Sequence, residues 1–132
     1  MRKKNEPRTI LIVDDEPENR RIYAEILNDL GYRTIEQADG ESALAAVKSG
    51  AAIDLVIADY RMPRMNGLQF IESLRHTLPA VPMIMVTAFA NVESYLQSFS
   101  LGVFEYMNKP FSKAEFVRIV KAALRSAGKE AA

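Results

Sequence analysis

Short, continuous apolar runs constrain the fold of this chain more than any other feature of its sequence. In residues 9–13, 55–58 and 82–87, β-branched and other apolar residues follow one another without polar alternation. This pattern is typical of strands that are covered on both faces, as in a parallel sheet between two layers of helices. Two further segments, residues 33–37 and 104–107, are predicted to be shorter strands of the same sheet.

Amphipathic segments separate the predicted strands. Pro17 suits the first turn of a helix, and Gly31 suits its C-terminal end. Apolar residues at helical spacing predict four more helices: a short one around residues 43–47 that ends near Gly50, then residues 67–75, residues 91–101 with Gly102 as the stop, and a last helix that Ser112 caps and that carries Leu124.

Five strands that alternate with five helices predict an α/β fold. The expected architecture is a doubly wound five-stranded parallel sheet of the flavodoxin-like (βα)5 type, with strand order 2-1-3-4-5. We expect a single domain over residues 1–132, with a core of about residues 9–125 and short tails at residues 1–8 and 126–132.

The composition argues against several classes of protein. The 132 residues include 17 basic and 17 acidic ones, and this zero net charge argues against direct nucleic-acid binding, which usually needs a basic excess. The absence of cysteine excludes disulfides, thiolate metal sites and a cysteine nucleophile. The apolar run of residues 10–13 is far too short for a signal peptide or a membrane span, so we expect a cytoplasmic protein with no membrane contact.

Polar residues stand at the predicted carboxyl ends of the strands, where open α/β sheets bind ligands. Asp14 and Asp15 follow the first strand, and Asp59 ends the third. Thr87 ends the fourth strand, and Lys109 follows the fifth. We therefore expect three carboxylates, a hydroxyl and a lysine to converge at one edge of the sheet.

These residue types suit a metal ion and a phosphoryl group. Three carboxylates at close range repel one another, and an oxygen-only ligand set favours Mg²⁺, with Mn²⁺ as a substitute. The metal, Lys109 and Thr87 would balance the charge of a phosphoryl group. Because no Ser–His–Asp or Cys–His set is present, Asp59 is the predicted nucleophile, and it would form an acyl phosphate. The single histidine, His76, is expected on the surface.

Each of these residues also has a purely structural explanation. Residues 14–16 could cap the following helix, while Thr87 and Lys109 could be ordinary strand-end and loop residues. Their joint placement at four strand ends is what favours a site.

Two other chemistries fit less well. A haloacid-dehalogenase-type phosphatase needs a second Asp where Arg61 stands, and residues 14–16 would repel the phosphate of a flavin mononucleotide.

Four ordered motifs resemble those of the receiver domain of bacterial two-component response regulators. They are Ile-Leu-Ile-Val-Asp-Asp-Glu at residues 10–16, Asp-Tyr-Arg-Met-Pro-Arg-Met-Asn-Gly at 59–67, Val-Thr-Ala at 86–88 and Tyr-Met-Asn-Lys-Pro-Phe at 106–111. The resemblance spans about residues 9–125. It implies a phosphoacceptor switch domain rather than a conventional enzyme.

The resemblance implies roles for the residues that match these motifs. Asp59 would accept a phosphoryl group from a phosphohistidine on a sensor histidine kinase or a histidine phosphotransfer protein. Asp14, Asp15 and Asp59 would hold Mg²⁺ together with the backbone carbonyl of Arg61. The domain would assist its own phosphorylation and dephosphorylation, and small acyl or amido phosphates would be further candidate donors. Gly67 is implied to be structural.

The resemblance also implies the phosphoryl-binding groups and a switch. Thr87, Ala88 and Lys109 would bind the phosphoryl group, and Lys109 would neutralise its charge. Thr87 and Tyr106 would form the switch, in which Tyr106 turns inward when Thr87 is drawn to the phosphate. Pro110 matches a structural proline of the family whose preceding peptide bond is often cis.

The switch would bias a surface made by residues 91–101, residues 104–107 and the last helix toward dimerisation or partner binding. Between residues 91 and 101 only Glu93 is charged, so the aromatic residues there could form a partner or dimer face in addition to a core stripe. The last helix carries cations that could form a solvated face or cross-subunit ion pairs with Glu93 and Glu105: Lys113, Arg118, Lys121 and Arg125.

Departures from the family pattern are modest. Asn66 stands where the family often has Asp before the glycine. Arg61 and Phe89 occupy two variable positions that tune dephosphorylation, in a direction that the sequence does not decide. Whether the chain is a stand-alone regulator or a piece of a longer one also stays open. The alternative to a phosphorylation switch is a receiver-like interaction module that works without phosphorylation.

Overall fold

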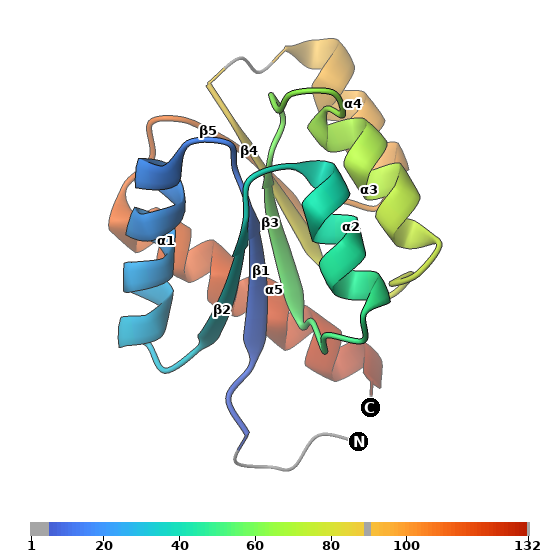
Figure 1. Cartoon of the computed structure of the whole chain (residues 1–132). Helices are drawn as coiled ribbons and strands as arrows, with labels where there is room; N and C mark the ends of the chain where they lie inside the picture. The colour runs from blue at the N-terminus through green and yellow to red at the C-terminus, as the bar shows by residue number, and fades with distance from the viewer. Residues whose placement is uncertain (1–5, 89–90, 132) are drawn as a thin grey trace.

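Five parallel strands form one sheet between two layers of helices in the computed structural model, which describes residues 6–88 and 91–131 (Figure 1). The order across the sheet is β2-β1-β3-β4-β5, so the predicted fold class and strand order are confirmed. The strands are β1 (Thr9–Val13), β2 (Arg33–Gln37), β3 (Leu55–Asp59), β4 (Met83–Thr87) and β5 (Glu105–Asn108).

Helices cover both faces of the sheet and give the chain two hydrophobic cores. The helices are α1 (Pro17–Asp29), α2 (Gly40–Lys48), α3 (Gly67–Arg75), α4 (Val92–Ser100) and α5 (Lys113–Ala131). One core joins α1 and α5 to the sheet, and the other joins α2 and α3 to its opposite face (Figure 1). Strands β1, β3 and β4 are buried on both faces, which explains their continuous apolar sequences. Within the described part of the chain, no helix combines the length and the apolar character that crossing a membrane requires.

Most element boundaries agree with the sequence, and the differences have local causes. Strand β4 begins at Met83 because Pro82 has no N–H to donate, although its carbonyl accepts a hydrogen bond from Val56 N. Helix α2 begins at Gly40, since the Asp39 carboxylate caps it by accepting from Ser42 N. Helix α5 extends to Ala131, beyond the end expected for the core near residue 125.

Gly67 starts α3 at a point where no side chain fits. A Cβ atom there would lie 2.8 Å from Tyr60 Cα and 2.9 Å from the Asp59 carbonyl oxygen. Both are backbone atoms that cannot move aside, and Gly67 N also donates to the Tyr60 carbonyl at 2.7 Å. The absence of a side chain therefore lets the loop after Asp59 fold back tightly on β3.

We predict that Gly67→Ala lowers the free energy of unfolding by about 2 kcal/mol, because overpacking against backbone cannot relax. Gly40→Ala is the matched control, since Gly40 also opens a helix but a Cβ there would meet mainly the movable Met65 thioether. Urea denaturation of both variants measures the difference. Equal losses in the two variants would contradict the steric explanation.

Candidate functional site

The register of the sheet brings four of the predicted site residues to one edge. Asp59, the last residue of β3, pairs with Val86, and Thr87, the last residue of β4, pairs with Asn108 just before Lys109. Asp14 follows β1, whose Val13 pairs with Ala58. Strands that end level with one another thus place the carboxylates, the threonine and the lysine side by side, as the sequence predicted.

Lys109 holds the two buried carboxylates together. Its Nζ donates a hydrogen bond of 2.8 Å to Asp59 Oδ2 and lies 3.6 Å from Asp14 Oδ2. Its backbone N donates to the Thr87 carbonyl at 2.8 Å, which fixes the lysine beside β4. Burial alone would lower the pKa of Lys109, but the Asp59 hydrogen bond and the nearby negative charges outweigh it, so the pKa is raised. The ammonium therefore stays charged at neutral pH.

Asp14 is a buried carboxylate with one unsatisfied oxygen. It is 1% exposed, and its Oδ1 accepts a hydrogen bond from Glu16 N at 2.9 Å. Its Oδ2 has no hydrogen-bond partner, and burial raises the pKa of the group despite the nearby Lys109. Helix α1 has Glu16 at its N-cap position without a side-chain cap bond. The alternative that the acidic run caps this helix is therefore wrong for Asp14.

Three carboxylates form a cluster that could hold a metal ion. Oxygen atoms of Asp14, Asp15 and Asp59 all lie within 4.8 Å of one another, and Asp15 is the exposed member. An all-oxygen set open to solvent on one side suits a hard cation that keeps several waters, as Mg²⁺ does. The buried Asp14 Oδ2 is the observation that favours a cation here, because a buried carboxylate oxygen without a hydrogen bond is costly.

The loop after Asp59 borders this cluster. Arg61 N donates to Asp59 Oδ1 at 3.0 Å, so both oxygens of Asp59 are engaged. A groove of about 520 Å³ opens beside the cluster, lined by Asp15, Tyr60, Arg61, Met62, Pro63 and Asn66. Asn66 accepts from Gln69 N and completes a capping box at the start of α3, which explains how an asparagine suits this position. The metal role of the Arg61 carbonyl stays a prediction.

The predicted switch residues lie on the neighbouring strands. Thr87 is fully buried, and Ala88 follows it on the surface. Tyr106 of β5 points inward, is 5% exposed, and its hydroxyl lies 2.6 Å from Ser94 Oγ on α4. The Lys109–Pro110 peptide bond is cis. Phe89, named above as a position that tunes dephosphorylation, lies outside the described residues.

Tyr23 is a neighbour of the site that the sequence did not single out. It lies on α1, and its ring stacks on Phe111 and Phe116 at centroid distances of 6.1 and 5.2 Å. Burial is the main cause that raises the pKa of its phenol, while the charge of Lys109 lowers it. Its position in the helical pattern pointed only to the core, so no sequence signal separated it from the other apolar residues of α1.

Carboxylates and a lysine gather at the carboxyl ends of the strands of a doubly wound parallel sheet. This arrangement defines the class of open α/β proteins that bind ligands at that edge of the sheet. A sequence model described as the response regulator receiver domain matches residues 10–121. The chain therefore belongs to the family of response regulator receiver domains, as its four motifs indicated.

Curated relatives differ in length. The chain is 35% identical over 123 residues to the probable transcriptional regulatory protein TcrX of Mycobacterium tuberculosis, which covers 93% of this chain and 52% of TcrX. It is 38% identical over 113 residues to the chemotaxis protein CheY-3 of Vibrio cholerae, which covers 83% of this chain and 86% of CheY-3. The chain thus spans about half the length of TcrX and most of CheY-3.

Solved structures agree with the fold. A CheY-like response regulator receiver domain protein from Methanospirillum hungatei superposes with a TM-score of 0.91 at 28% identity, over 95% of this chain and 99% of that one. The chemotaxis protein CheY4 of Vibrio cholerae gives a TM-score of 0.84 at 28% identity, over 89% of this chain and 99% of that one.

We predict that Asp14→Asn stabilises the metal-free protein at neutral pH by about 1 kcal/mol, because neutralising a buried, poorly paired carboxylate removes a desolvation cost. The pKa of Asp14 is raised in the folded state, so the folded protein holds this proton more tightly than the unfolded chain. The tighter binding of this proton adds to the free energy of unfolding at pH values below the ordinary Asp pKa, and this addition is lost as pH rises through the raised pKa of Asp14.

The gain from Asp14→Asn should therefore shrink toward low pH. Urea denaturation in EDTA at several pH values measures it, with the exposed Asp15→Asn as the matched control. An Asp14→Asn variant that is less stable than wild type at neutral pH would contradict the prediction.

Proposed function

We propose that this chain is a phosphorylation switch in which Asp59 accepts a phosphoryl group from a histidine kinase or a histidine phosphotransfer protein. One observation carries the proposal: a lysine bridges two buried carboxylates, one of which keeps an oxygen without a hydrogen-bond partner. The carboxylates would favour the binding of a cation, and the ammonium of Lys109 would favour the binding of an anionic phosphoryl group. Membership of the receiver family supports the same function.

In the proposed reaction an Asp59 oxygen attacks the phosphorus of the donor, the new O–P bond forms, and the P–N bond to the histidine breaks with the imidazole as the leaving group. Lys109 already contacts Asp59 Oδ2 and would follow the transferred group with its positive charge. Asp14, Asp15 and Asp59 would hold Mg²⁺, which supplies further positive charge to the phosphoryl oxygens.

Thr87 and Ala88 complete the proposed phosphoryl site. Thr87 ends the strand that pairs with the strand of Asp59. The Thr87 carbonyl accepts a hydrogen bond from Lys109 N, so a shift of Thr87 would also displace the backbone of Lys109. Hydrolysis by water would later break the O–P bond and return the Asp59 carboxylate. The phosphoryl group would make different contacts in two conformations of the domain, and this difference would shift the population from one conformation to the other.

Helix α4 supplies the proposed output surface together with β5 and α5. Tyr95, Leu96 and Phe99 are exposed on α4, which leaves large apolar groups available for a partner or a second copy.

The names of the relatives point to different outputs, transcriptional regulation for TcrX and chemotaxis for CheY-3. Lys121 and Arg125 of α5 line a groove together with Arg8 and Tyr32.

We expect the protein to gain one phosphoryl group when it is incubated with Mg²⁺ and acetyl phosphate, as measured by intact mass. Asp59→Asn should show no gain, and Lys109→Ala should slow it about a hundredfold because it removes the positive charge beside the nucleophile. Lys113→Ala is the matched control, since Lys113 is exposed at the start of α5.

Binding of BeF₃⁻ with Mg²⁺ covers the case of a protein that accepts only from its kinase. Absence of both the phosphoryl gain and BeF₃⁻ binding would overturn the switch and favour an interaction module that works without phosphorylation. Gain in Asp59→Asn would show that another residue is the acceptor.

A further inference from the structure

Helix α4 is packed in an unusual way. Among its described side chains the buried ones are Ser94 and Ser98, which are 2% and 0% exposed. The large apolar ones face outward, with Tyr95 at 46%, Leu96 at 61% and Phe99 at 41%. None of the described large apolar side chains of α4 is fully buried, and the Tyr95 ring packs edge-on against Tyr106 at a centroid distance of 5.6 Å, so the apolar burial that holds most surface helices in place is only partial here. Directional hydrogen bonds must do more to position this helix.

A chain of hydroxyl hydrogen bonds ties the N-terminal turn of α4 to β5. Ser94 Oγ donates to the Asn91 carbonyl at 3.2 Å, and Tyr106 Oη lies 2.6 Å from Ser94 Oγ. Either hydroxyl can donate in the contact between Tyr106 and Ser94, and in both cases the contact joins the two side chains. Asn91 is the N-cap of α4, and its Oδ1 accepts from Ser94 N at 2.8 Å. Tyr106 thus reaches the cap of the helix through one side chain.

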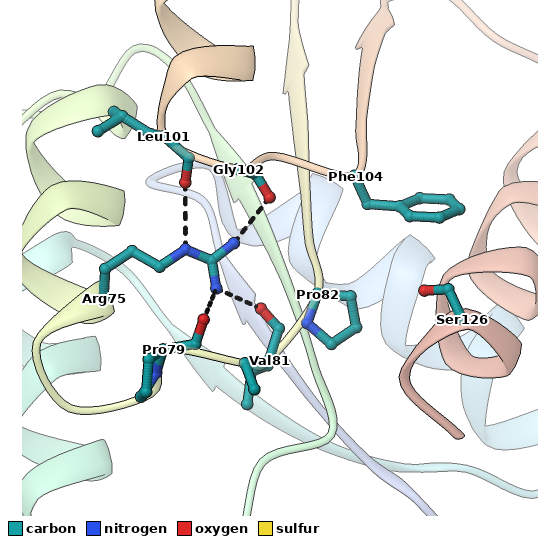
Figure 2. A pocket seen from close by; sticks show the side chains of 9 residues that line it. Arg75, Pro79, Val81, Pro82, Leu101, Gly102, Phe104 and Ser126 are labelled. Carbon is teal, nitrogen blue, oxygen red and sulfur yellow. Dashed lines mark hydrogen bonds between the residues drawn. The ribbon is translucent and has the colours of Figure 1, made fainter. Parts of the chain in front are cut away.

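The other end of α4 is held by Arg75, the last residue of α3 (Figure 2). Its Nε donates to the Leu101 carbonyl at 3.1 Å and its Nη2 to the Gly102 carbonyl at 2.8 Å. The same guanidinium donates through Nη1 to the Val81 carbonyl at 2.7 Å and the Pro79 carbonyl at 3.1 Å. One rigid, planar group therefore joins the C-terminal end of α4 to the segment that enters β4.

The two ends of α4 are held very differently. Several charge-assisted hydrogen bonds from one side chain fix the C-terminal end. Among the described residues, a neutral hydroxyl contact and the edge-on packing of Tyr95 on Tyr106, at a centroid distance of 5.6 Å, connect the N-terminal turn to β5. Asn91 also follows Thr87 by four positions in the chain. The N-terminal end of α4 is therefore the end that lies nearer to Thr87 along the chain.

We propose that Ser94 is a positioning residue that couples Tyr106 to the N-terminal turn of α4, and that α4 pivots about the end fixed by Arg75. The inference deepens the proposed phosphorylation switch and rests on it for its trigger. In this arrangement the Ser94 hydroxyl transmits the state of Thr87 and Tyr106 to the exposed face of Tyr95, Leu96 and Phe99.

Amide hydrogen exchange of α4, measured by NMR, tests the coupling in the metal-free protein first. Ser94→Ala should raise the exchange rates of the amides of residues 94–96 roughly three- to tenfold, as expected for the loss of one net hydrogen bond. Tyr106→Phe removes the partner hydroxyl and should have the same effect. The double variant should add nothing further, because both changes break one interaction. Additive effects would overturn the coupling.

Ser98→Ala is the matched control, since Ser98 is equally buried but its Oγ donates only within α4, to the Tyr95 carbonyl at 2.7 Å. It should leave the exchange of residues 94–96 within twofold of wild type. Arg75→Lys should raise exchange at residues 100–103 and leave residues 94–96 unaffected, since a lysine cannot reproduce the fork of hydrogen bonds. The reverse distribution would overturn the pivot.

The second measurement repeats these exchange experiments with Mg²⁺ and BeF₃⁻. Wild-type α4 should change its exchange on binding, and Ser94→Ala should lose more than half of that change while it still binds BeF₃⁻. A residue that only stabilises the fold would shift both states equally. An intact α4 response in Ser94→Ala would overturn the proposal. A wild-type protein that does not bind BeF₃⁻ would instead count against the phosphorylation switch, and the metal-free double-variant experiment would still decide the coupling.

Discussion

The ion bridge from Lys109 to Asp59 and Asp14 is the interaction on which the functional edge of this protein depends. Two carboxylates that are buried side by side would repel each other, and each would lose its hydration. The Lys109 ammonium offsets part of that cost, at 2.8 Å from one carboxylate and 3.6 Å from the other. The compensation is incomplete, because Asp14 Oδ2 has no hydrogen-bond partner and the pKa of Asp14 is raised. The incompletely compensated negative charge of Asp14 suits this edge of the sheet to the binding of a cation.

The sheet makes this bridge possible, and the sequence already contains most of the reasons. Continuous apolar strands require two covering layers, and the parallel arrangement places all carboxyl ends at one edge. The positions of Asp14, Asp59, Thr87 and Lys109 could therefore be predicted from strand ends alone. The structure then adds what spacing cannot give, namely that Lys109 contacts both carboxylates and that Asp14 is buried and is not a helix cap.

The residues that the sequence did not reveal act through contacts between distant segments. The sequence pattern assigns no role to Ser94, and nothing near it in the chain indicates that the Tyr106 hydroxyl lies 2.6 Å from its Oγ. The sequence pattern marks residue 75 only as the end of a helix, yet the hydrogen bonds of Arg75 reach carbonyls more than twenty positions further along the chain. Tyr23 matched the core pattern of α1 although it also lies near Lys109. Periodicity assigns a face to each residue but not the identity of the group that it meets.

The packing of α4 explains how such contacts can matter beyond stability. A helix held by a broad apolar face resists displacement in every direction, because any shift exposes area. Helix α4 buries Ser94 and Ser98 and leaves its aromatic side chains about half exposed, so directional hydrogen bonds, together with the packing of Tyr95 on Tyr106, carry much of its attachment. Interactions of that kind favour discrete positions over gradual deformation. The exposed aromatic residues are also those that a partner would bury under the proposed function, so the features that weaken the packing of α4 on its own domain are the ones that would favour its burial by a partner.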